Sequence, residues 1–204
     1  GKLESGTLSA YSFMMDKIKK LEITPAQLAL EPCSAGCVIV DPHSGDVLAC
    51  VSYPGYDNNR LTNTMDSAYF AALNKDLSKP LYSRATQEQT APGSTFKPVV
   101  TTAGLEEGVI TPTETMNATG VYTDAYGSPT CWIYNQYHGS HGRVNVVDAL
   151  RVSCNYYFYE VGFRLGGGRT SGYSSDRALE ILEKYAREYG LTERTGIQIP
   201  ENAS

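Results

Sequence analysis

The spacing of apolar residues near the start of the chain follows the period of a helix. These apolar residues are Tyr11, Met14, Met15, Ile18 and Leu21. Residues that recur every three or four positions share one face of a helix, and Ser9 can act as its N-cap. The pattern predicts an amphipathic helix over residues 10–21 and, with the connector behind it, a separate N-terminal segment over residues 1–35.

The pattern then changes to two runs rich in β-branched residues, 37–40 and 47–52, on either side of a turn rich in Pro, Ser, Gly and Asp. Such an arrangement is typical of a β-hairpin. The first run is apolar throughout, so we expect both of its faces to be buried.

Helical patterns dominate the rest of the chain. Residues 111–143 are the exception, because they hold many turn formers and little periodicity, and we expect a long irregular segment there. Strands that come first, with most helices after them, indicate an α+β fold rather than alternating βαβ units. The predicted helices are residues 66–76 capped by Asp66, 94–107 ended by Gly108, 145–165 broken near Ser153, and 176–190 capped by Asp176.

Composition and charge exclude several functional classes. The chain has 204 residues with a net charge of −5, which argues against nucleic acid as a partner. The one tight basic cluster, 17–20, fits the solvated face of the first helix. No apolar run reaches the ~18–20 residues of a membrane span, no signal peptide is recognisable, and the first residue is Gly1, so we expect a trimmed piece of a longer protein.

The five cysteines do not form a regular disulfide framework, because their number is odd and their spacing irregular. Cys131, His138 and His141 are residue types that bind zinc, but their spacing fits no common zinc site. We therefore expect a loop with solvated histidines and no metal or other cofactor.

The stretch TAPGSTFKPVV, residues 90–100, places Ser94 and Lys97 three positions apart at an expected helix start. Side chains three apart share a helix face, so a neutral lysine there can take the serine proton. Bringing the lysine pKa near 7 corresponds to about 4–5 kcal/mol, which only burial or a neighbouring cation supplies. The motif alone is weak, but VSCN adds a second hydroxyl and a side-chain amide at Ser153 and Asn155, beside a helix break.

These segments together resemble the transpeptidase domain of penicillin-binding proteins, and most of all the class B, monofunctional branch. The resemblance covers about residues 36–200. It is carried by VIVDPHSGDVLACVSYPGYDNNR, LYSRATQEQTAPGSTFKP, VNVVDALRVSCNYYFYEVGFRLG and REYGLTERTGIQIPE. The family's motif trio is Ser-x-x-Lys, Ser-x-Asn and Lys-Thr-Gly. It implies that residues 36–204 form the N-terminal portion of such a domain, with a fold shared with serine β-lactamases: an antiparallel hairpin plus a helical subdomain.

The resemblance also implies the roles of individual residues. Ser94 would be the acylated nucleophile, Lys97 its proton acceptor, Ser153 the relay to the leaving group and Asn155 the ligand of the substrate amide. The substrate would be a peptidoglycan stem peptide ending in D-Ala-D-Ala, which β-lactams mimic. The parent protein would be membrane-anchored at the extracytoplasmic face of the bacterial cell.

One motif of the family is missing, because the chain contains no Lys-Thr-Gly. Arg194-Thr195-Gly196 lies in the TGIQIPE segment, which in this family precedes the third motif, so we interpret it as a turn without a catalytic role. We therefore expect this chain to be inactive by itself. We also expect its open hairpin edge either to pair with a second copy, giving a dimer, or to be covered by the helix at residues 10–21.

Other functions stay open at this point. A D,D-carboxypeptidase or serine β-lactamase shares Ser-x-x-Lys, and a β-lactam sensor or non-catalytic scaffold would keep the serine without turnover. A Ser-His-Asp hydrolase is disfavoured, because no Gly-x-Ser-x-Gly is present and the three histidines fall in predicted turns. Cys154, the middle residue of the second motif, fits a small buried filler better than a redox switch.

Overall fold

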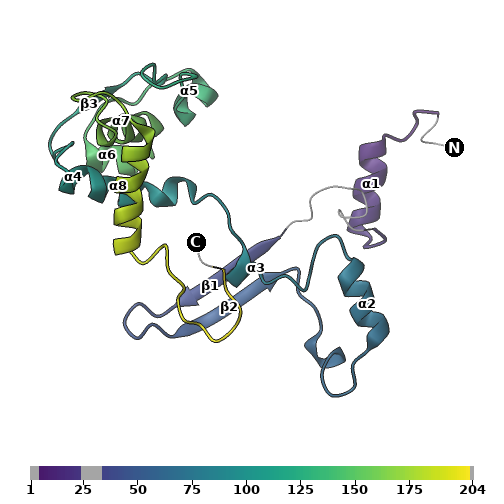
Figure 1. The fold of residues 1–204 in the computed structure, drawn as a ribbon. Helices are drawn as coiled ribbons and strands as arrows, with labels where there is room; N and C mark the ends of the chain where they lie inside the picture. Colours follow the sequence, from purple (N-terminus) through teal and green to yellow (C-terminus); the bar gives the residue numbers. More distant parts are fainter. Residues whose placement is uncertain (1–4, 24–33, 203–204) are drawn as a thin grey trace. The chain divides into compact units, whose positions relative to one another are not determined.

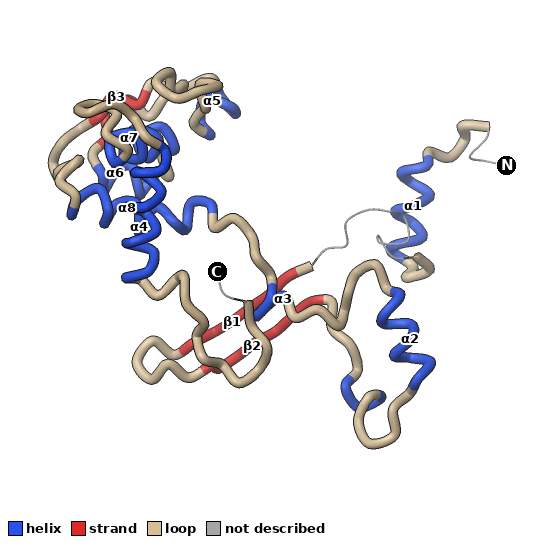
Figure 2. Tube along the Cα trace, in the orientation of Figure 1, coloured by secondary structure: helices blue, strands red, loops and turns tan. Residues whose placement is uncertain are grey.

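The computed structural model describes residues 5–23 and 34–202 and divides the chain into two compact units. One unit comprises Gly1–Gln89 and Gly196–Asn202, and the other comprises Thr90–Thr195. Figures 1 and 2 show a two-stranded sheet in the first unit and mostly helices in the second. Helices combined with small antiparallel sheets make an α+β protein, as the sequence predicts. Residues 24–33, most of the expected N-terminal connector, lie outside the described residues.

The first helix, α1, spans Ala10–Lys19 and starts as predicted. The Ser9 side chain accepts a hydrogen bond from the backbone N–H of Ser12 at 3.1 Å, which satisfies one of the free donors at the helix start. The helix ends two residues earlier than expected, and Leu21 takes a left-handed conformation with φ 57°. Among the helices in the described residues, none combines the length and the apolar character needed to cross a membrane.

The predicted hairpin is confirmed. Strands β1 (Ala35–Val40) and β2 (Val47–Tyr53) pair antiparallel, and the short helix α3 (Arg84–Gln87) packs against both. A Cβ at Gly36 would stand 3.0 Å from the backbone nitrogen of Ala85, so α3 can approach the sheet only over a glycine. The hairpin and α3 thus form a small layer of the first unit.

The prediction that residues 37–40 are buried on both faces is wrong. Val38, Ile39 and Val40 are 48%, 51% and 47% exposed. All six residues of β1 are exposed, because the described part of this sheet has two strands and α3 is the helix that packs on it. An apolar sequence shows that a strand would be more stable if both faces were buried. Whether the faces are buried depends on layers contributed by other segments.

The second helix, α2 (Ser67–Lys75), begins at the predicted cap. The Asp66 side chain accepts a hydrogen bond from the Tyr69 backbone N–H at 2.9 Å. Asp66 also pairs with Arg60, which ends the 3-10 turn η2 (Asn58–Arg60), at 2.6 Å. The loop before α2 is thereby tied to the start of the helix.

The second unit is built around a helix pair and its neighbours. The 3-10 turn η3 (Gly93–Phe96) leads directly into α4 (Lys97–Glu106), and Gly108 follows with φ 67°. The sequence predicted one helix from residue 94. Three later helices are α6 (Val146–Arg151), α7 (Asn155–Leu165) and α8 (Ser175–Glu188), and α4 contacts all three. Their buried faces form the core, which includes Val99, Ala103, Ala149, Tyr157, Val161, Leu165, Tyr185 and Ala186.

Two details of this unit differ from the sequence-based expectation. Residues 111–143 contain three short elements: β3 (Met116–Ala118), which pairs with β4 (Gly142–Val144), and α5 (Trp132–Tyr137). Elements of three to six residues are too short to show a period, so the sequence gives no sign of them. Helix α8 is capped by Ser174 rather than by Asp176, which instead lies in its first turn.

A buried carboxylate ties α7 to the loops around it. Glu160 accepts hydrogen bonds from Tyr122 Oη at 2.7 Å, from Arg164 Nε at 2.7 Å and from Arg169 Nη2 at 2.7 Å. Burial acts to raise the pKa of Glu160, but the hydrogen bonds from Arg169, Arg164 and Tyr122 outweigh it and hold the pKa below its usual value. Glu160 is therefore charged at neutral pH inside the unit.

Candidate active site

Ser94 lies exposed in the turn that leads into α4. Gly93 before it has φ 59°, a conformation that glycine adopts without strain, and this aims the chain into the 3-10 turn η3. Pro98 stands in the first turn of α4, where the backbone N–H it lacks would have no helical partner. The sequence around Ser94 thus sets a hydroxyl at a helix entrance, open to solvent.

Lys97, one turn later, points into the unit and is only 8% exposed. Its Nζ donates three hydrogen bonds: to Ser153 Oγ at 2.9 Å, to the Ser153 carbonyl at 3.0 Å and to Asn155 Oδ1 at 2.7 Å. The ring of Phe158 lies 5.3 Å from the ammonium. Burial lowers the pKa of Lys97 from its ordinary value, against a smaller opposing effect of Cys131 and Cys154.

Ser153 and Asn155 come from the break between α6 and α7. Ser153 has φ 49°, which is unfavourable for a residue with a side chain and costs of order 1–3 kcal/mol. The turn is held by hydrogen bonds from Ser153 N to the Leu150 carbonyl and from Cys154 N to the Ala149 carbonyl, at 3.1 and 2.8 Å. Asn155 then opens α7.

Ser153 connects the other polar groups. Its Oγ donates to Ser94 Oγ at 3.0 Å and accepts from Lys97 Nζ at 2.9 Å. Residues that are 59 positions apart in the sequence therefore form one chain of contacts, Ser94–Ser153–Lys97, with Asn155 on the far side of the ammonium. All four residues that the sequence singled out lie together, and the lysine reaches Ser94 through Ser153.

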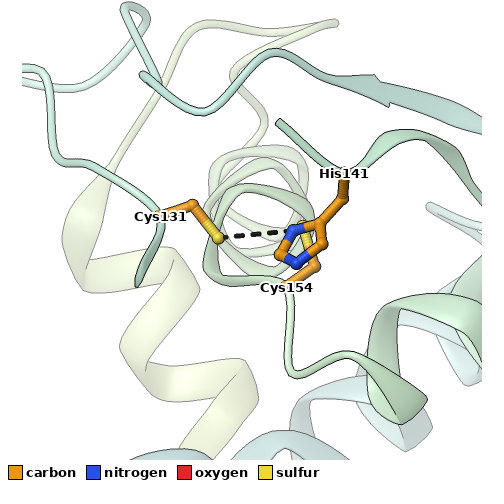
Figure 3. A group of neighbouring side chains, drawn as sticks. All are labelled: Cys131, His141 and Cys154. Atoms are coloured by element: carbon orange, nitrogen blue, oxygen red, sulfur yellow. Dashed lines mark hydrogen bonds between the residues drawn. The ribbon is translucent and has the colours of Figure 1, made fainter. Parts of the chain in front are cut away.

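A second group of reactive side chains lies beside this site. Figure 3 shows Cys131, His141 and Cys154, which we call the sulfur–imidazole cluster; their ligand-type atoms lie within 4.8 Å of one another. Cys131 Sγ is 3.6 Å from His141 Nδ1, and both cysteines are fully buried. The buried Nε2 of His141 has no hydrogen-bond partner among the described residues.

The expectation of a loop with solvated histidines is therefore wrong for His141 and right for His138, which is exposed. The trial ligand set from the sequence correctly contained Cys131 and His141, but it also included His138, which is not part of the cluster, and it left out Cys154. Cys154 is buried, as expected of a small filler, but it also faces two other ligand-type side chains. The three residues come from separate parts of the chain: Cys131 is the N-cap of α5, His141 directly precedes β4, and Cys154 is the N-cap of α7.

The cluster fits a soft divalent cation. Two thiols and one imidazole are a donor set of zinc, and three protein ligands leave one position for a further ligand. Tetrahedral zinc with Zn–S bonds of 2.3 Å would place two sulfurs about 3.8 Å apart, so small side-chain shifts suffice. Without a cation the Cys154 thiol is neutral at pH 7, because burial raises its pKa to about 11. Burial and the nearby Lys97 lower the pKa of His141, which favours the neutral imidazole that binds metals.

Arg194-Thr195-Gly196 lies in an irregular segment after α8 and not on a strand. Gly196 has φ 82°, and its N–H donates to Glu201 at 3.0 Å. The segment is irregular at these three residues and does not form the turn expected from the sequence, and its lack of a catalytic role stays a prediction.

Comparison with known proteins identifies the family of the chain. The sequence model of the penicillin binding protein transpeptidase domain matches residues 35–204. The chain belongs to this family. It is 34% identical over 167 residues to the peptidoglycan D,D-transpeptidase MrdA of Haemophilus influenzae, covering 82% of this chain and 24% of that protein. The chain thus spans about a quarter of the length of the curated relatives that it matches first.

Solved structures show the same fold. Penicillin-binding protein PBP2 of Pseudomonas aeruginosa, in complex with WCK 5153, aligns with a TM-score of 0.69 and 29% identity, over 87% of this chain and 37% of that one. The imipenem acyl-enzyme complex of penicillin-binding protein A from M. tuberculosis aligns with a TM-score of 0.66 and 30% identity, over 84% and 38%. The predicted class B transpeptidase fold is confirmed by these matches.

The sequence analysis did not identify the contacts that Phe158 and Cys131 make with the candidate site residues. Phe158 forms a wall beside Lys97, and Cys131 accepts a hydrogen bond from the Asn155 backbone N–H at 3.2 Å. The available signal was the presence of two cysteines and two histidines between residues 131 and 154, but their spacing alone did not show which of them converge.

Proposed function

We propose that Ser94 is the nucleophile of a peptidoglycan D,D-transpeptidase, with Lys97 as proton acceptor, Ser153 as relay and Asn155 as ligand of the substrate amide. The observation that carries the proposal is the chain of contacts from exposed Ser94 through Ser153 to buried Lys97. It is supported by family membership and by the name of the Haemophilus relative, a peptidoglycan D,D-transpeptidase.

Proton transfer in this arrangement runs through Ser153. Once Lys97 is neutral, both hydroxyl hydrogens can reverse their direction, so that Ser94 donates to Ser153 and Ser153 donates to Lys97 Nζ. The lowered pKa of Lys97 increases the fraction of the neutral form at a given pH. The Ser94 oxygen is then able to attack a carbonyl while its proton moves to the lysine.

The reaction has two halves. Ser94 Oγ attacks the carbonyl of the penultimate D-alanine, the bond to the terminal D-alanine breaks, and its amine takes a proton back from Lys97 through Ser153. The acyl group on Ser94 then passes to an amine of a neighbouring strand, which frees the serine and returns a proton. A β-lactam replaces the D-Ala-D-Ala end, and its ring amide opens to leave a stable acyl group on Ser94.

The parent protein would work at the extracytoplasmic face of the bacterial cell membrane, where stem peptides are cross-linked. The support is the cell-wall role stated in the names of its relatives. We also propose that the exposed hairpin edge of β1 and β2 pairs with a second copy of this chain when no other segment covers it.

A β-lactam sensor or scaffold is the alternative of a different class. It would acylate at Ser94 and then neither transfer the acyl group to an amine nor release it. A D,D-carboxypeptidase or β-lactamase would release it to water instead. Product analysis with an added acceptor amine separates these outcomes, and a cross-linked product supports the transpeptidase.

Intact-mass analysis after incubation with penicillin tests the proposal. We expect this 204-residue sequence, which contains no Lys-Thr-Gly, to label very slowly or not at all. In the family that it resembles, the Lys-Thr-Gly strand supplies one N–H of the oxyanion hole, and loss of one oxyanion donor typically costs ~10²–10³ in rate. A longer chain of the same protein that includes the third motif should label once, and Ser94→Ala should abolish the label. Ser44→Ala, in the exposed hairpin turn, is the matched control.

Two results would contradict this reasoning. Labelling that persists in Ser94→Ala would exclude Ser94 as the nucleophile. Rapid stoichiometric labelling of the 204-residue chain would show that the third motif is not required and would give Arg194-Thr195-Gly196 a role.

A further inference from the structure

We propose that Cys131 is a positioning residue of the active site, which holds the start of α7 and thereby the side chain of Asn155. The contact between Cys131 and the start of α7 carries this inference. Helices α1, α2, α6 and α8 each receive a hydrogen bond on the side chain of their own N-cap residue, whereas α3, α4, α5 and α7 do not. Instead, the first N–H of α7, that of Asn155, donates to the sulfur of Cys131 at 3.2 Å, from a segment 24 residues earlier.

Cys131 is itself fixed by its backbone. Its N–H donates to the Gly120 carbonyl at 2.7 Å, and its own carbonyl accepts from Tyr134 N at 3.0 Å and from Asn135 N at 3.2 Å. The residue is fully buried and forms the N-cap of α5. The sulfur therefore has little freedom to move. A group that positions another group must itself be held in place.

The hydrogen bond between the Asn155 N–H and Cys131 lies next to the side chains of the candidate active site. Asn155 Oδ1 accepts from Lys97 Nζ at 2.7 Å, and two residues earlier Ser153 contacts both Lys97 and Ser94. The left-handed conformation of Ser153 persists only where its surroundings hold it. The bonds to α6 hold the turn from its start, and the bond to Cys131 holds it from its end.

A purely structural role makes a different prediction. Removing a buried sulfur leaves a small cavity and lowers the stability of the whole unit, which would affect all α7 amides alike. Loss of an anchor affects the Asn155 amide selectively. The role of Asn155 in catalysis rests on the function proposed above, but the hydrogen bond and its effect on Asn155 do not.

Amide hydrogen exchange resolved by NMR, on the 204-residue chain with reduced thiols and a chelator present, is the test. In the parent chain the Asn155 amide should be protected, although the first N–H groups of a helix ordinarily are not. Cys131→Ala should speed exchange of this amide about fivefold relative to the interior α7 amide of Val161, as expected for one lost hydrogen bond. Cys131→Ser, which keeps an acceptor, should restore part of the protection.

Val99→Ala is the matched control, because it also removes buried side-chain atoms from the core of this unit and leaves the bond between Cys131 and Asn155 in place. It should leave the protection of Asn155, relative to Val161, unchanged. The proposal is overturned if the Asn155 amide is unprotected in the parent chain, or if Cys131→Ala and Val99→Ala change the ratio of Asn155 exchange to Val161 exchange equally. Penicillin labelling of the longer chain is scored separately, so failure of the proposed function is seen there and not in the exchange data.

Discussion

Replacing Glu160 by glutamine tests how strongly a buried charge holds the helical unit together. The Glu160 side chain is 7% exposed and forms ion pairs with Arg164 and Arg169, while Tyr122 donates to it as well. Glutamine keeps the shape and can still accept from Tyr122, but it removes the negative charge between two guanidinium groups. Arg164 and Arg169 keep second partners in Glu114 and Asp124, so neither cation is left alone.

The expected loss of stability follows from burial. Breaking a buried ion pair from one side costs about 3–5 kcal/mol. We expect the lower end, about 3 kcal/mol, because Arg169 is 47% exposed and solvent screens its pair. For a chain of this size that corresponds to a fall in Tm of about 6–12 °C.

Urea unfolding followed by the fluorescence of Trp132 measures this change, because Trp132 is the only tryptophan of the chain and lies in the same unit. Glu183→Gln is the control: Glu183 also pairs with an arginine four residues later, but both side chains are 62% exposed. Its loss should cost only about 0.3–0.5 kcal/mol.

The dependence on pH has a definite sign. The pKa of Glu160 is lower in the folded chain than its ordinary value of 4.5, so its contribution to stability is complete above pH 4.5. That contribution is lost as the pH falls through the folded pKa, and the difference between parent and Glu160→Gln should shrink in acid. Equal effects of the two substitutions at pH 7, or a difference that does not shrink by about pH 3, would refute the reasoning.

Two further predictions concern other parts of the chain. Isothermal titration of the reduced protein should show Zn²⁺ binding at the sulfur–imidazole cluster. His141→Ala should weaken this binding at least about tenfold, whereas His138→Ala, at an exposed histidine, should leave it unchanged. Equal effects of the two substitutions would exclude the cluster as the site. Light scattering over a concentration series should show a dimer. Val38→Lys should dissociate it and Ala72→Lys on α2 should not, since Val38 lies in the exposed hairpin. A monomer at all concentrations would contradict pairing through the hairpin edge.

The sequence by itself determined the elements whose signals are local. Ser9 and Asp66 were recognised as caps because a cap bonds to a backbone N–H only two or three residues away. The hairpin was recognised because two runs of β-forming residues and the turn between them lie within twenty residues. Ser94, Lys97, Ser153 and Asn155 were identified through family motifs, which are themselves short.

The tertiary structure decided what depends on segments far apart. Lys97 contacts Ser153, 56 residues later, and only this contact shows that the lysine reaches Ser94 through a second hydroxyl. Burial of residues 37–40 was predicted wrongly because burial is a property of the layers around a strand and not of the strand. The sulfur–imidazole cluster forms because residues next to α5, β4 and the α6–α7 turn meet at one place. A pattern within a short stretch of sequence does not show which distant segments come into contact.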